Sequence, residues 1–367
     1  MNSKTIVIKL GTSMLTSGTK YLDSAHMIEV VRAIAELEQQ GHHVVVVTSG
    51  AMAAGREALN FPQLPKTIAY KQMLASVGQT YLMNRWQKLF EIYKLHIGQL
   101  LLTRADLEDR ERFLNAKDAL CALISEGIIP VINENDAVAT SEIKVGDNDN
   151  LSARVAILAD ADLLILLTDQ KGLFTADPRN NPEAKLLERV TEIDDDIKAL
   201  AGGSISGLGT GGMATKLQAA EIANRSGVEV VIASGVNPSI LIDIVSGTFV
   251  GTTFEAKNSP LESKKAWLLS GPMPIGSIIV DKGAITALVT NGASLLPKGI
   301  VGIEGEFLRG EVVRITDVEG HYVARGITRY SSVELQQIAR HNSEEIVEIL
   351  GYGHGHVAVH RDDLVLV

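Results

Sequence analysis

Short aliphatic runs recur through the first 235 residues, separated by segments whose apolar residues are spaced three and four apart. The runs occupy residues 5–10, 43–47, 96–102, 128–132, 163–167 and 229–233. The spacing in 23–40 and 113–126 predicts helices. Strands that are buried on both faces and joined by helices are typical of a parallel sheet between two helical layers. We therefore expect an α/β fold, a three-layer αβα sandwich with a mainly parallel sheet.

The pattern changes after about residue 255. Pro, Gly and Ser in 258–260 and 271–274 are typical of a linker, and short alternating strands with Gly turns follow. These strands are expected at 276–281, 310–315 and 322–328. The chain then divides into an αβα domain, a linker, a small mostly-β domain and a C-terminal tail, at residues 1–257, 258–273, 274–352 and 353–367.

Composition narrows the class of protein. Hydrophobic residues make up 46% of the chain and aromatic residues only 4%, which predicts an aliphatic interior. The single cysteine, Cys121, excludes an internal disulfide framework, fits a reducing compartment, and is expected as a packed thiol. No apolar run approaches the length of a bilayer span, and a net charge of −10 gives no general affinity for nucleic acid or anionic membrane. We expect a cytoplasmic protein.

Residues 133–150 hold an unusual density of short carboxylates and amides. Asn133 to Asp136 follow a predicted buried strand, and Asp147 to Asn150 precede an apolar helical pattern. Buried groups of this kind need partners, and a helix N-terminus attracts anionic ligands. The segment therefore predicts a loop that grips a small polar ligand, with a solvated, turn-rich loop as the alternative.

Three more polar motifs follow predicted strands: Lys9 with Gly11, Ser49 with Gly50, and Thr168-Asp169. Because ligands bind beyond the carboxyl ends of parallel strands, these motifs and Asn133 to Asp136 are expected along one rim. A lysine followed by glycine and two hydroxyl residues can hold phosphate oxygens. The alternatives are a solvated lysine, a serine that only caps a helix, and a simple turn.

The most glycine-dense stretch runs from Gly207 to Lys216. Gly207, Gly209 and Gly212 match the spacing of a dinucleotide fingerprint, but the preceding residues 194–203 do not have the pattern of a strand. Lys216 falls in the first turn of a predicted helix, where a cation is unfavourable unless an anion shares the site, so we expect phosphate binding. The histidines near the end of the chain lack accompanying cysteines, so a zinc site is not expected and no residue is assigned to a metal.

Together these segments resemble the amino acid kinase family over essentially the whole chain. The resemblance lies in residues 8–13, 47–51, 102–106, 131–136, 144–152, 167–172 and 209–216. Residues 144–152 best indicate the branch that phosphorylates the side-chain carboxylate of glutamate at the start of proline biosynthesis. Residues 296–300, 305–307 and 309–315 resemble a PUA module.

The resemblance implies ATP and Mg²⁺ as cofactors, L-glutamate as acceptor, inhibition by proline at or overlapping the glutamate site, and a homo-oligomer, either a dimer or a tetramer. It implies catalysis by Lys9 and Lys216, with Asp149 orienting both. The implied ATP contacts are Lys9, Gly11, Thr168, Asp169, Thr210, Gly211, Gly212, Met213, Ala214, Thr215 and Lys216. The implied glutamate contacts are Ser49, Asp136 and Asn148, with Asn133 and Asp147 as further members of the substrate loop.

This chemistry agrees with the residues available. A side-chain carboxylate with a pKa of about 4.3 is already ionised at neutral pH and needs no general base, and the chain has no recognisable catalytic histidine pattern. The alternatives are another family member, such as an acetylglutamate, aspartate, carbamate or uridylate kinase, and an RNA-binding protein acting through the PUA-like domain. From residue 264 onward there are ten Lys and Arg against twelve Asp and Glu, so charge does not support RNA binding.

Overall fold

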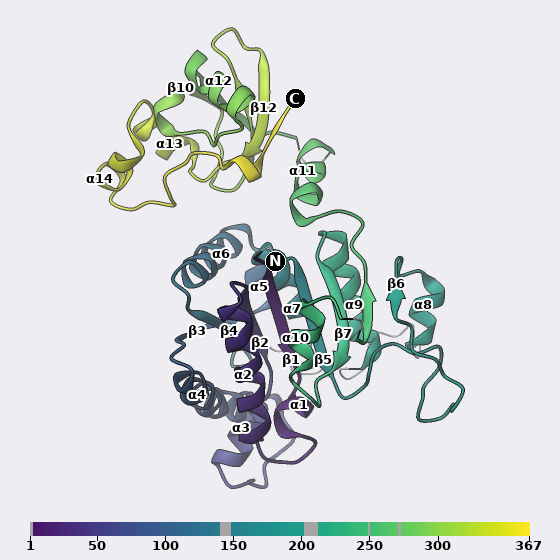
Figure 1. Ribbon diagram of the computed structural model, residues 1–367. Helices are drawn as coiled ribbons and strands as arrows, with labels where there is room; N and C mark the ends of the chain where they lie inside the picture. The colour runs from purple at the N-terminus through teal and green to yellow at the C-terminus, as the bar shows by residue number, and fades with distance from the viewer. Residues whose placement is uncertain (1–2, 140–147, 202–211, 249, 271–272) are drawn as a thin grey trace. The chain divides into compact units, whose positions relative to one another are not determined.

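The computed structural model describes residues 3–139, 148–201, 212–248, 250–270 and 273–367 (Figure 1). Its contacts divide the chain into two compact units. The larger unit comprises the residues up to Asp109 and Ala119–Pro260, and the smaller unit comprises Arg110–Asp118 and Leu261–Val367. The domain boundaries expected from composition, at 257, 273 and 352, stay predictions.

The larger unit is built on one sheet, which has eight strands within the described residues. In spatial order these are β3 (Ile97–Leu102), β4 (Ile129–Glu134), β2 (His43–Thr48), β1 (Thr5–Leu10), β5 (Leu163–Thr168), β7 (Glu229–Ser234), β8 (Thr252–Phe254) and β6 (Arg189–Val190). All neighbours pair in parallel except β7 and β8. The six predicted strands are confirmed, whereas β6 and β8 are too short to have been recognised.

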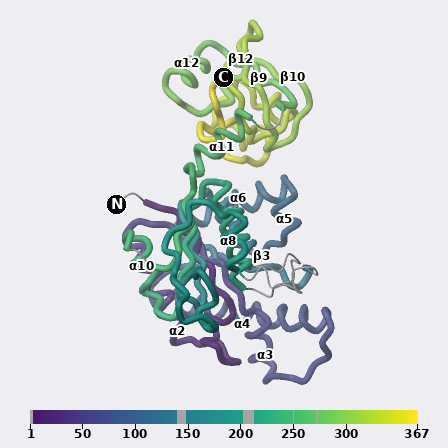
Figure 2. The backbone as a smooth tube through the Cα atoms, turned by 90° about the vertical axis from the view of Figure 1, so that its right-hand side faces the viewer, coloured from purple at the N-terminus to yellow at the C-terminus, as the bar shows by residue number. Residues whose placement is uncertain are grey.

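Helices cover both faces of this sheet (Figures 1 and 2). One face packs against α2 (Ser24–Gln39), α4 (Ile68–Ile92) and α10 (Ile240–Val245), and the other against α7 (Asn148–Leu158) and α9 (Met213–Arg225). The remaining helices of this part of the chain are α1 (Thr12–Thr16), α3 (Ala51–Ala58), α5 (Arg104–Glu108), α6 (Arg110–Ser125) and α8 (Asp195–Leu200). The expected three-layer αβα sandwich is confirmed.

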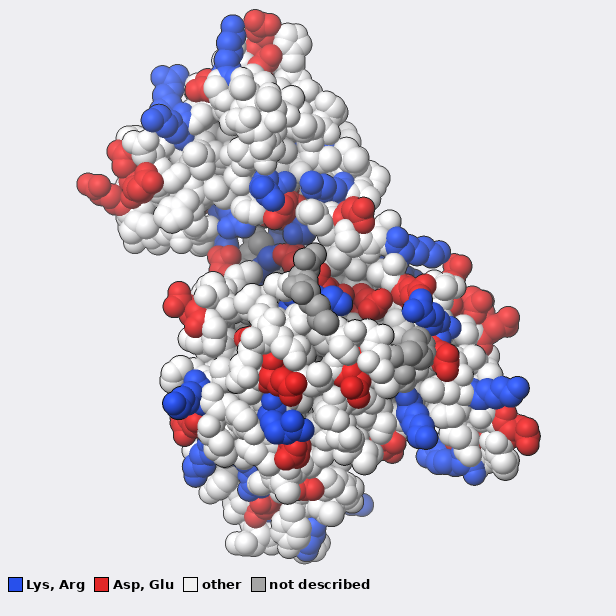
Figure 3. All heavy atoms as spheres, viewed as in Figure 1, with Lys and Arg blue, Asp and Glu red and all other residues white. Residues whose placement is uncertain are grey.

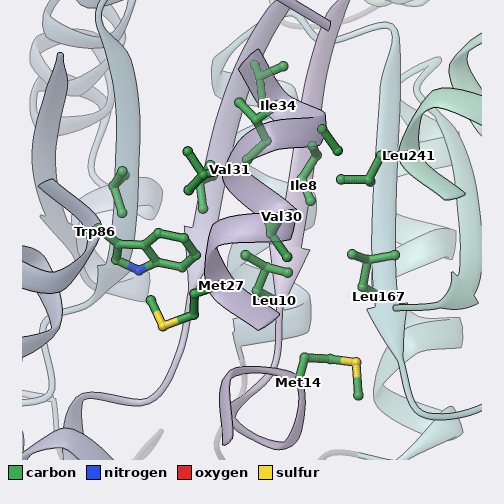
Figure 4. Close-up of a cluster of buried hydrophobic side chains, with 14 of the residues drawn as sticks. Ile8, Leu10, Met14, Met27, Val30, Val31, Ile34, Trp86, Leu167 and Leu241 are labelled. Atoms are coloured by element: carbon green, nitrogen blue, oxygen red, sulfur yellow. The ribbon is translucent and has the colours of Figure 1, made fainter. Parts of the chain in front are cut away.

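Alternation along β1 decides which side chain reaches which layer. Ile6, Ile8 and Leu10 belong to the core cluster that packs against α2. Figure 4 shows Ile8 and Leu10 in this cluster together with Trp86 and Leu241. Fully burying such an aliphatic side chain stabilises a fold by about 1.5–3 kcal/mol. Because successive residues of a strand point to opposite faces, Lys9 is directed to the other layer, which contains α7 and α9. The strand that anchors the core thus carries a lysine to the opposite face.

Two glycines bring α3 and α4 into direct backbone contact. A Cβ at Gly55 would lie 2.0 Å from the carbonyl oxygen of Leu74, and one at Gly78 would lie 1.7 Å from that of Ala51. No side chain fits at such distances, so glycine at both positions permits this packing. The close approach fixes α4 against the helix that follows β2.

The smaller unit contains a five-stranded sheet with its own core. In spatial order its strands are β10 (Ile300–Glu304), β9 (Gly276–Val280), β11 (Val312–Thr316), β12 (Tyr322–Ile327) and β13 (Leu364–Leu366). The helices that follow α11 (Pro260–Ser270) are α12 (Lys282–Asn291), α13 (Ser332–Ile338) and α14 (Ile346–Leu350). The expected small mostly-β domain is confirmed, and β13, within the expected tail, pairs with β12.

Two further sequence inferences have clear outcomes. The segment before the glycine-rich stretch forms α8, not a strand, which agrees with rejecting the dinucleotide fingerprint. Cys121 is exposed, so the prediction of a packed thiol is wrong: α6 fully buries only Leu120, and the neighbouring position is not covered. Among the helices of the described ranges, none is both long enough and apolar enough to cross a membrane.

Candidate active site

The predicted polar motifs lie at the carboxyl-terminal edge of the large sheet. Ser49 directly follows β2, and its backbone N–H donates to the carbonyl of Leu10 at the end of β1, at 3.1 Å. Asn133 is the penultimate residue of β4, and Thr168 is the last residue of β5. Because β4, β2, β1 and β5 are successive neighbours, these residues share one rim, as expected.

Two lysines and one aspartate form a buried charged cluster at this rim. The Lys9 ammonium lies 2.5 Å from Oδ1 of Asp149, and the Lys216 ammonium lies 3.1 Å from Oδ2 of the same carboxylate. Relative exposure is 6% for each lysine and 2% for the aspartate. Buried charges are tolerated only when paired, so each lysine depends on Asp149 to stay at this position. Two cations that are distant in sequence therefore meet at one carboxylate.

Thr215 is a further partner of Asp149, because its hydroxyl donates to Oδ2 at 2.7 Å. Burial by itself would raise the pKa of Asp149. The two ammonium groups and the Thr215 hydroxyl outweigh that effect and hold the pKa below its usual value of 3.8. Asp149 is therefore an anion at neutral pH, and it also lies in the first turn of α7, where a negative charge is favourable.

Lys216 depends on Asp149 for a second reason, besides the burial of its charge. It lies in the first turn of α9, where the helix dipole disfavours a cation, and Asp149 supplies the compensating charge within the protein. The net charge of the cluster is still +1, since two ammonium groups face one carboxylate. That excess suits an anionic ligand.

Two glycines flank the cluster without any backbone need for glycine. Gly11 and Gly212 have φ angles of −77° and −92°, which any residue adopts. A Cβ at Gly11 would lie 3.5 Å from the Lys9 ammonium, and one at Gly212 would meet no atom of the described residues within 4 Å. Neither position has a side chain that could compete with a ligand for the ammonium groups, and two such groups suit the phosphates of ATP.

A second, neutral cluster surrounds the neighbouring residue Asn148. Its amide nitrogen lies 2.8 Å from the carbonyl oxygen of Thr48, 2.8 Å from Oγ of Ser49 and 2.9 Å from Oδ1 of Asn133. Gly50, not Ser49, is the N-cap of α3, and its φ of 96° is one that favours glycine. Ser49 therefore does not act as the helix cap, and its hydroxyl belongs to the amide cluster.

Asp136 lines a pocket of about 490 Å³ at the same rim. Residues from α3, α4, β3 and the end of β4 form its wall: Ala51, Ala75, Ser76, Gln79, Thr80, Met83, Asn84, Gln87, Gln99, Leu101, Glu134, Asn135, Asp136 and Ala137. Amides and two carboxylates dominate the polar part of this wall, and none of the described residues that form it is a lysine or an arginine. A ligand with an ammonium group fits that charge distribution.

The remaining predicted site residues are placed as follows. The Thr168 hydroxyl donates to Asp169 at 3.0 Å, and Asp169 is exposed. Met213 and Ala214 begin α9. Asp147, Thr210 and Gly211 lie outside the described residues. Sequence reasoning missed Gln79, whose Oε1 accepts from Asn133 at 2.8 Å, because nothing in the pattern of α4 distinguishes this glutamine from others on the helix.

Magnesium prefers oxygen ligands. Both carboxylate oxygens of Asp149 are already engaged by the lysines and Thr215. Among the described residues, the one group of three or more potential metal ligands is Asp317, Glu319 and His321, on the smaller unit. The donor set at the charged cluster therefore fits a nucleotide's anionic phosphates better than a bare cation.

Comparison with known proteins identifies the family. The model of the amino acid kinase family matches residues 4–234, and that of the PUA domain matches residues 276–350. The glutamate 5-kinase of Sodalis glossinidius is 60% identical over 365 residues, which cover 100% of this chain and 99% of the relative. That of Photobacterium profundum is 61% identical over 364 residues, covering 99% and 96%, and that of Erwinia tasmaniensis is 60% identical over 365, covering 100% and 99%. The chain belongs to the amino acid kinase family.

Proposed function

We propose that this protein transfers the γ-phosphoryl group of ATP to the side-chain carboxylate of L-glutamate, giving L-glutamyl 5-phosphate, the first step of proline biosynthesis. The observation that carries the proposal is the buried pairing of Lys9 and Lys216 with the two oxygens of Asp149. The glutamate 5-kinase relatives support the choice of acceptor over other kinases of the family.

The charged cluster would carry the phosphoryl transfer. An oxygen of the glutamate side chain attacks the γ-phosphorus, the bond to the β-phosphate oxygen breaks, and ADP leaves with that electron pair. Lys9 and Lys216 would stabilise the negative charge on the passing phosphoryl group, and Asp149 would hold both ammonium groups in place before the reaction. Gly11 and the loop from Thr210 to Lys216 would hold the phosphates, with Thr168 and Asp169 beside the nucleotide.

The amide cluster would bind glutamate. Ser49 and Asn148 would hydrogen-bond its polar groups, and Asp136 would pair with its α-ammonium, with Asn133 and Asp147 as further members of the site. Neutral amides and hydroxyls select by geometry, because a ligand without the matching groups leaves buried donors unpaired.

Magnesium, when bound with ATP, would neutralise phosphate charge and template the transfer. We propose that the nucleotide phosphates carry it, since the lysines and Thr215 occupy Asp149. Inhibition by proline at or overlapping the glutamate site, a homo-oligomer and a cytoplasmic location are further parts of this proposal, supported by the family resemblance.

The direct test incubates the pure protein with Mg-ATP and each candidate acceptor in turn, with hydroxylamine present to trap the acyl phosphate. We expect ADP release and hydroxamate with glutamate, and neither with N-acetylglutamate, aspartate, carbamate or UMP. Hydroxamate from aspartate or acetylglutamate, but not from glutamate, would refute the proposed acceptor.

A further inference from the structure

Gln79 contacts the amide cluster from α4, which covers the other face of the sheet from α7, the helix that carries Asn148. It lies on α4, lines the 490 Å³ pocket, and accepts a hydrogen bond through Oε1 from Nδ2 of Asn133 at 2.8 Å. The preceding residue is Gly78, where α4 meets the backbone of α3. Because this backbone contact prevents α4 from sliding along its axis, the position of Gln79 relative to Ser49 and Gly50 is fixed.

The direction of the Asn133 amide is determined by its surroundings. The backbone N–H of Glu134, which can only donate, donates to Oδ1 of Asn133 at 2.9 Å. A reversed Asn133 amide would place its NH₂ group against this donor, and its oxygen against Oε1 of Gln79. Asn133 must therefore present its oxygen to Asn148 and its nitrogen to Gln79.

The same reasoning extends to Asn148. Its Nδ2 faces Oδ1 of Asn133 and the carbonyl oxygen of Thr48, both of which can only accept. The third atom near Nδ2 is Oγ of Ser49, at 2.8 Å, so the two amide hydrogens are shared among three oxygens. Because an amide nitrogen cannot accept a hydrogen bond, the hydroxyl hydrogen of Ser49 is not used there and is available to another partner.

The Nε2 atom of Gln79 indicates that the side chain contributes through its oxygen. Its Nε2 is buried and, within the described part of the chain, has no hydrogen-bond partner. Leaving a buried donor unpaired costs about 1–3 kcal/mol. A glutamine held at that cost contributes through its oxygen, which is the atom bonded to Asn133.

We propose that Gln79 is a positioning residue for the acceptor: through Asn133 and Asn148 it fixes Ser49 as a hydrogen-bond donor to the acceptor's carboxylate. This inference rests on the proposed kinase function and adds a residue that acts on the acceptor through Asn133, Asn148 and Ser49. It also links the helix layer on one face of the sheet to the site at its edge.

The test replaces Gln79 by methionine, which has nearly the same shape and no acceptor oxygen. Loss of one hydrogen bond corresponds to about 1 kcal/mol, so we expect the KM for glutamate to rise about fivefold. The KM for ATP should stay within about twofold, because the charged cluster is untouched. An unchanged KM for glutamate would overturn the proposal.

A double-mutant cycle distinguishes positioning from a direct contact. If Gln79 acts through Ser49, then Gln79→Met should change the KM for glutamate by less than about twofold in a Ser49→Ala background, because residues in one network are not additive. An undiminished fivefold effect in that background would show that Gln79 acts independently of Ser49, and would overturn the proposal.

Gln39→Met is the control for the substitution itself. Gln39 is exposed at the end of α2 and is not among the described residues that line the pocket. We expect this variant to have wild-type KM values for glutamate and for ATP. Should Gln79→Met fail to fold, Gln79→Ala carries the same expectations. The wild-type hydroxamate assay is run first, so a failure of the kinase proposal is seen separately from a failure at Gln79.

Discussion

The two clusters at the rim differ in chemistry although neighbouring residues of one helix turn organise them. Asp149 directs its carboxylate to the ammonium groups of Lys9 and Lys216, whereas Asn148 directs its amide to Ser49 and Asn133. The charged cluster draws on β1 and α9, and the neutral cluster draws on β2 and β4. The first turn of α7 joins them.

The difference indicates two roles: the charged cluster acts through its charge, and the neutral cluster acts through the geometry of its hydrogen bonds. Fixed cations stabilise developing negative charge, and their effect is largest in a site that excludes water. Neutral amides contribute little charge but fix the direction of each hydrogen bond, which is what substrate recognition requires. We expect variants of the charged cluster to lower kcat, and variants of the neutral cluster to raise the KM for glutamate.

The largest effects are expected for the lysines. Lys9→Met and Lys216→Met each remove one ammonium group from the transition state and should lower kcat by about 10²–10³-fold, roughly 3–4 kcal/mol. Each change also leaves Asp149 with one buried cation instead of two, so melting curves must accompany the steady-state kinetics. Near-normal kcat in either variant would remove that lysine from the reaction.

Ser49→Ala tests the neutral cluster. A hydrogen bond to a charged group contributes about 1.5–3 kcal/mol, so the KM for glutamate should rise about 10–100-fold. The KM for ATP and the melting temperature should change little, because Ser49 is not the N-cap of α3. A fall in kcat with an unchanged KM for glutamate would contradict the division between the two clusters.

Gly11→Ala tests the position beside Lys9. The backbone accepts alanine at a φ of −77°, so the free energy of unfolding should not fall, whereas the added methyl group enters space proposed for phosphate. We expect the KM for ATP to rise by about tenfold, or roughly 1.4 kcal/mol. Gly50→Ala is the contrasting control, since its φ of 96° predicts lost stability in the free protein.

The lowered pKa of Asp149 predicts a pH dependence of stability. A carboxylate whose pKa is lower in the folded state stabilises the fold above its unfolded pKa and loses that contribution as pH falls through the folded value. The difference in free energy of unfolding between wild type and Asp149→Asn should therefore be constant above about pH 5 and shrink below 3.8. Denaturant titrations at several pH values measure it, and a difference that grows on acidification would contradict the assigned charge.

The smallest expected signal is RNA binding. The face of the smaller unit drawn in Figure 3 mixes cationic and anionic side chains, and residues from 264 onward carry a slight negative charge. Phosphate-backbone binding needs a basic surface and weakens steeply with salt. A filter-binding titration with tRNA at low salt should show no tight complex. Tight, salt-sensitive binding would give the PUA domain a role of its own.

The strands that carry the site could be predicted, because a strand buried on both faces has a nearly uninterrupted apolar sequence. The six main strands are rich in aliphatic residues, and the polar residues that follow neighbouring parallel strands share a rim. The pairing of Asp149 with Lys216, 67 residues apart, follows from how α7 packs on α9, which no spacing encodes. The family resemblance implied that pairing, and the geometry agrees with it.

Other features left no usable pattern. Helical spacing shows that α6 has an apolar face but not that the face is covered, which is why Cys121 was misassigned. Gln79 is one of several glutamines on and near α4, and only its contact with Asn133 distinguishes it. The short strands β6 and β8 fall below the length at which alternation is visible.

The central claim is that one carboxylate holds two lysines for phosphoryl transfer, and Asp149→Asn tests it most directly. The side chain keeps its shape and loses the charge that pairs both ammonium groups. We predict that kcat falls by about 10²-fold or more, on the scale of a lost electrostatic group, in protein that still binds glutamate by calorimetry. A kcat within threefold of wild type in that folded variant would contradict the account.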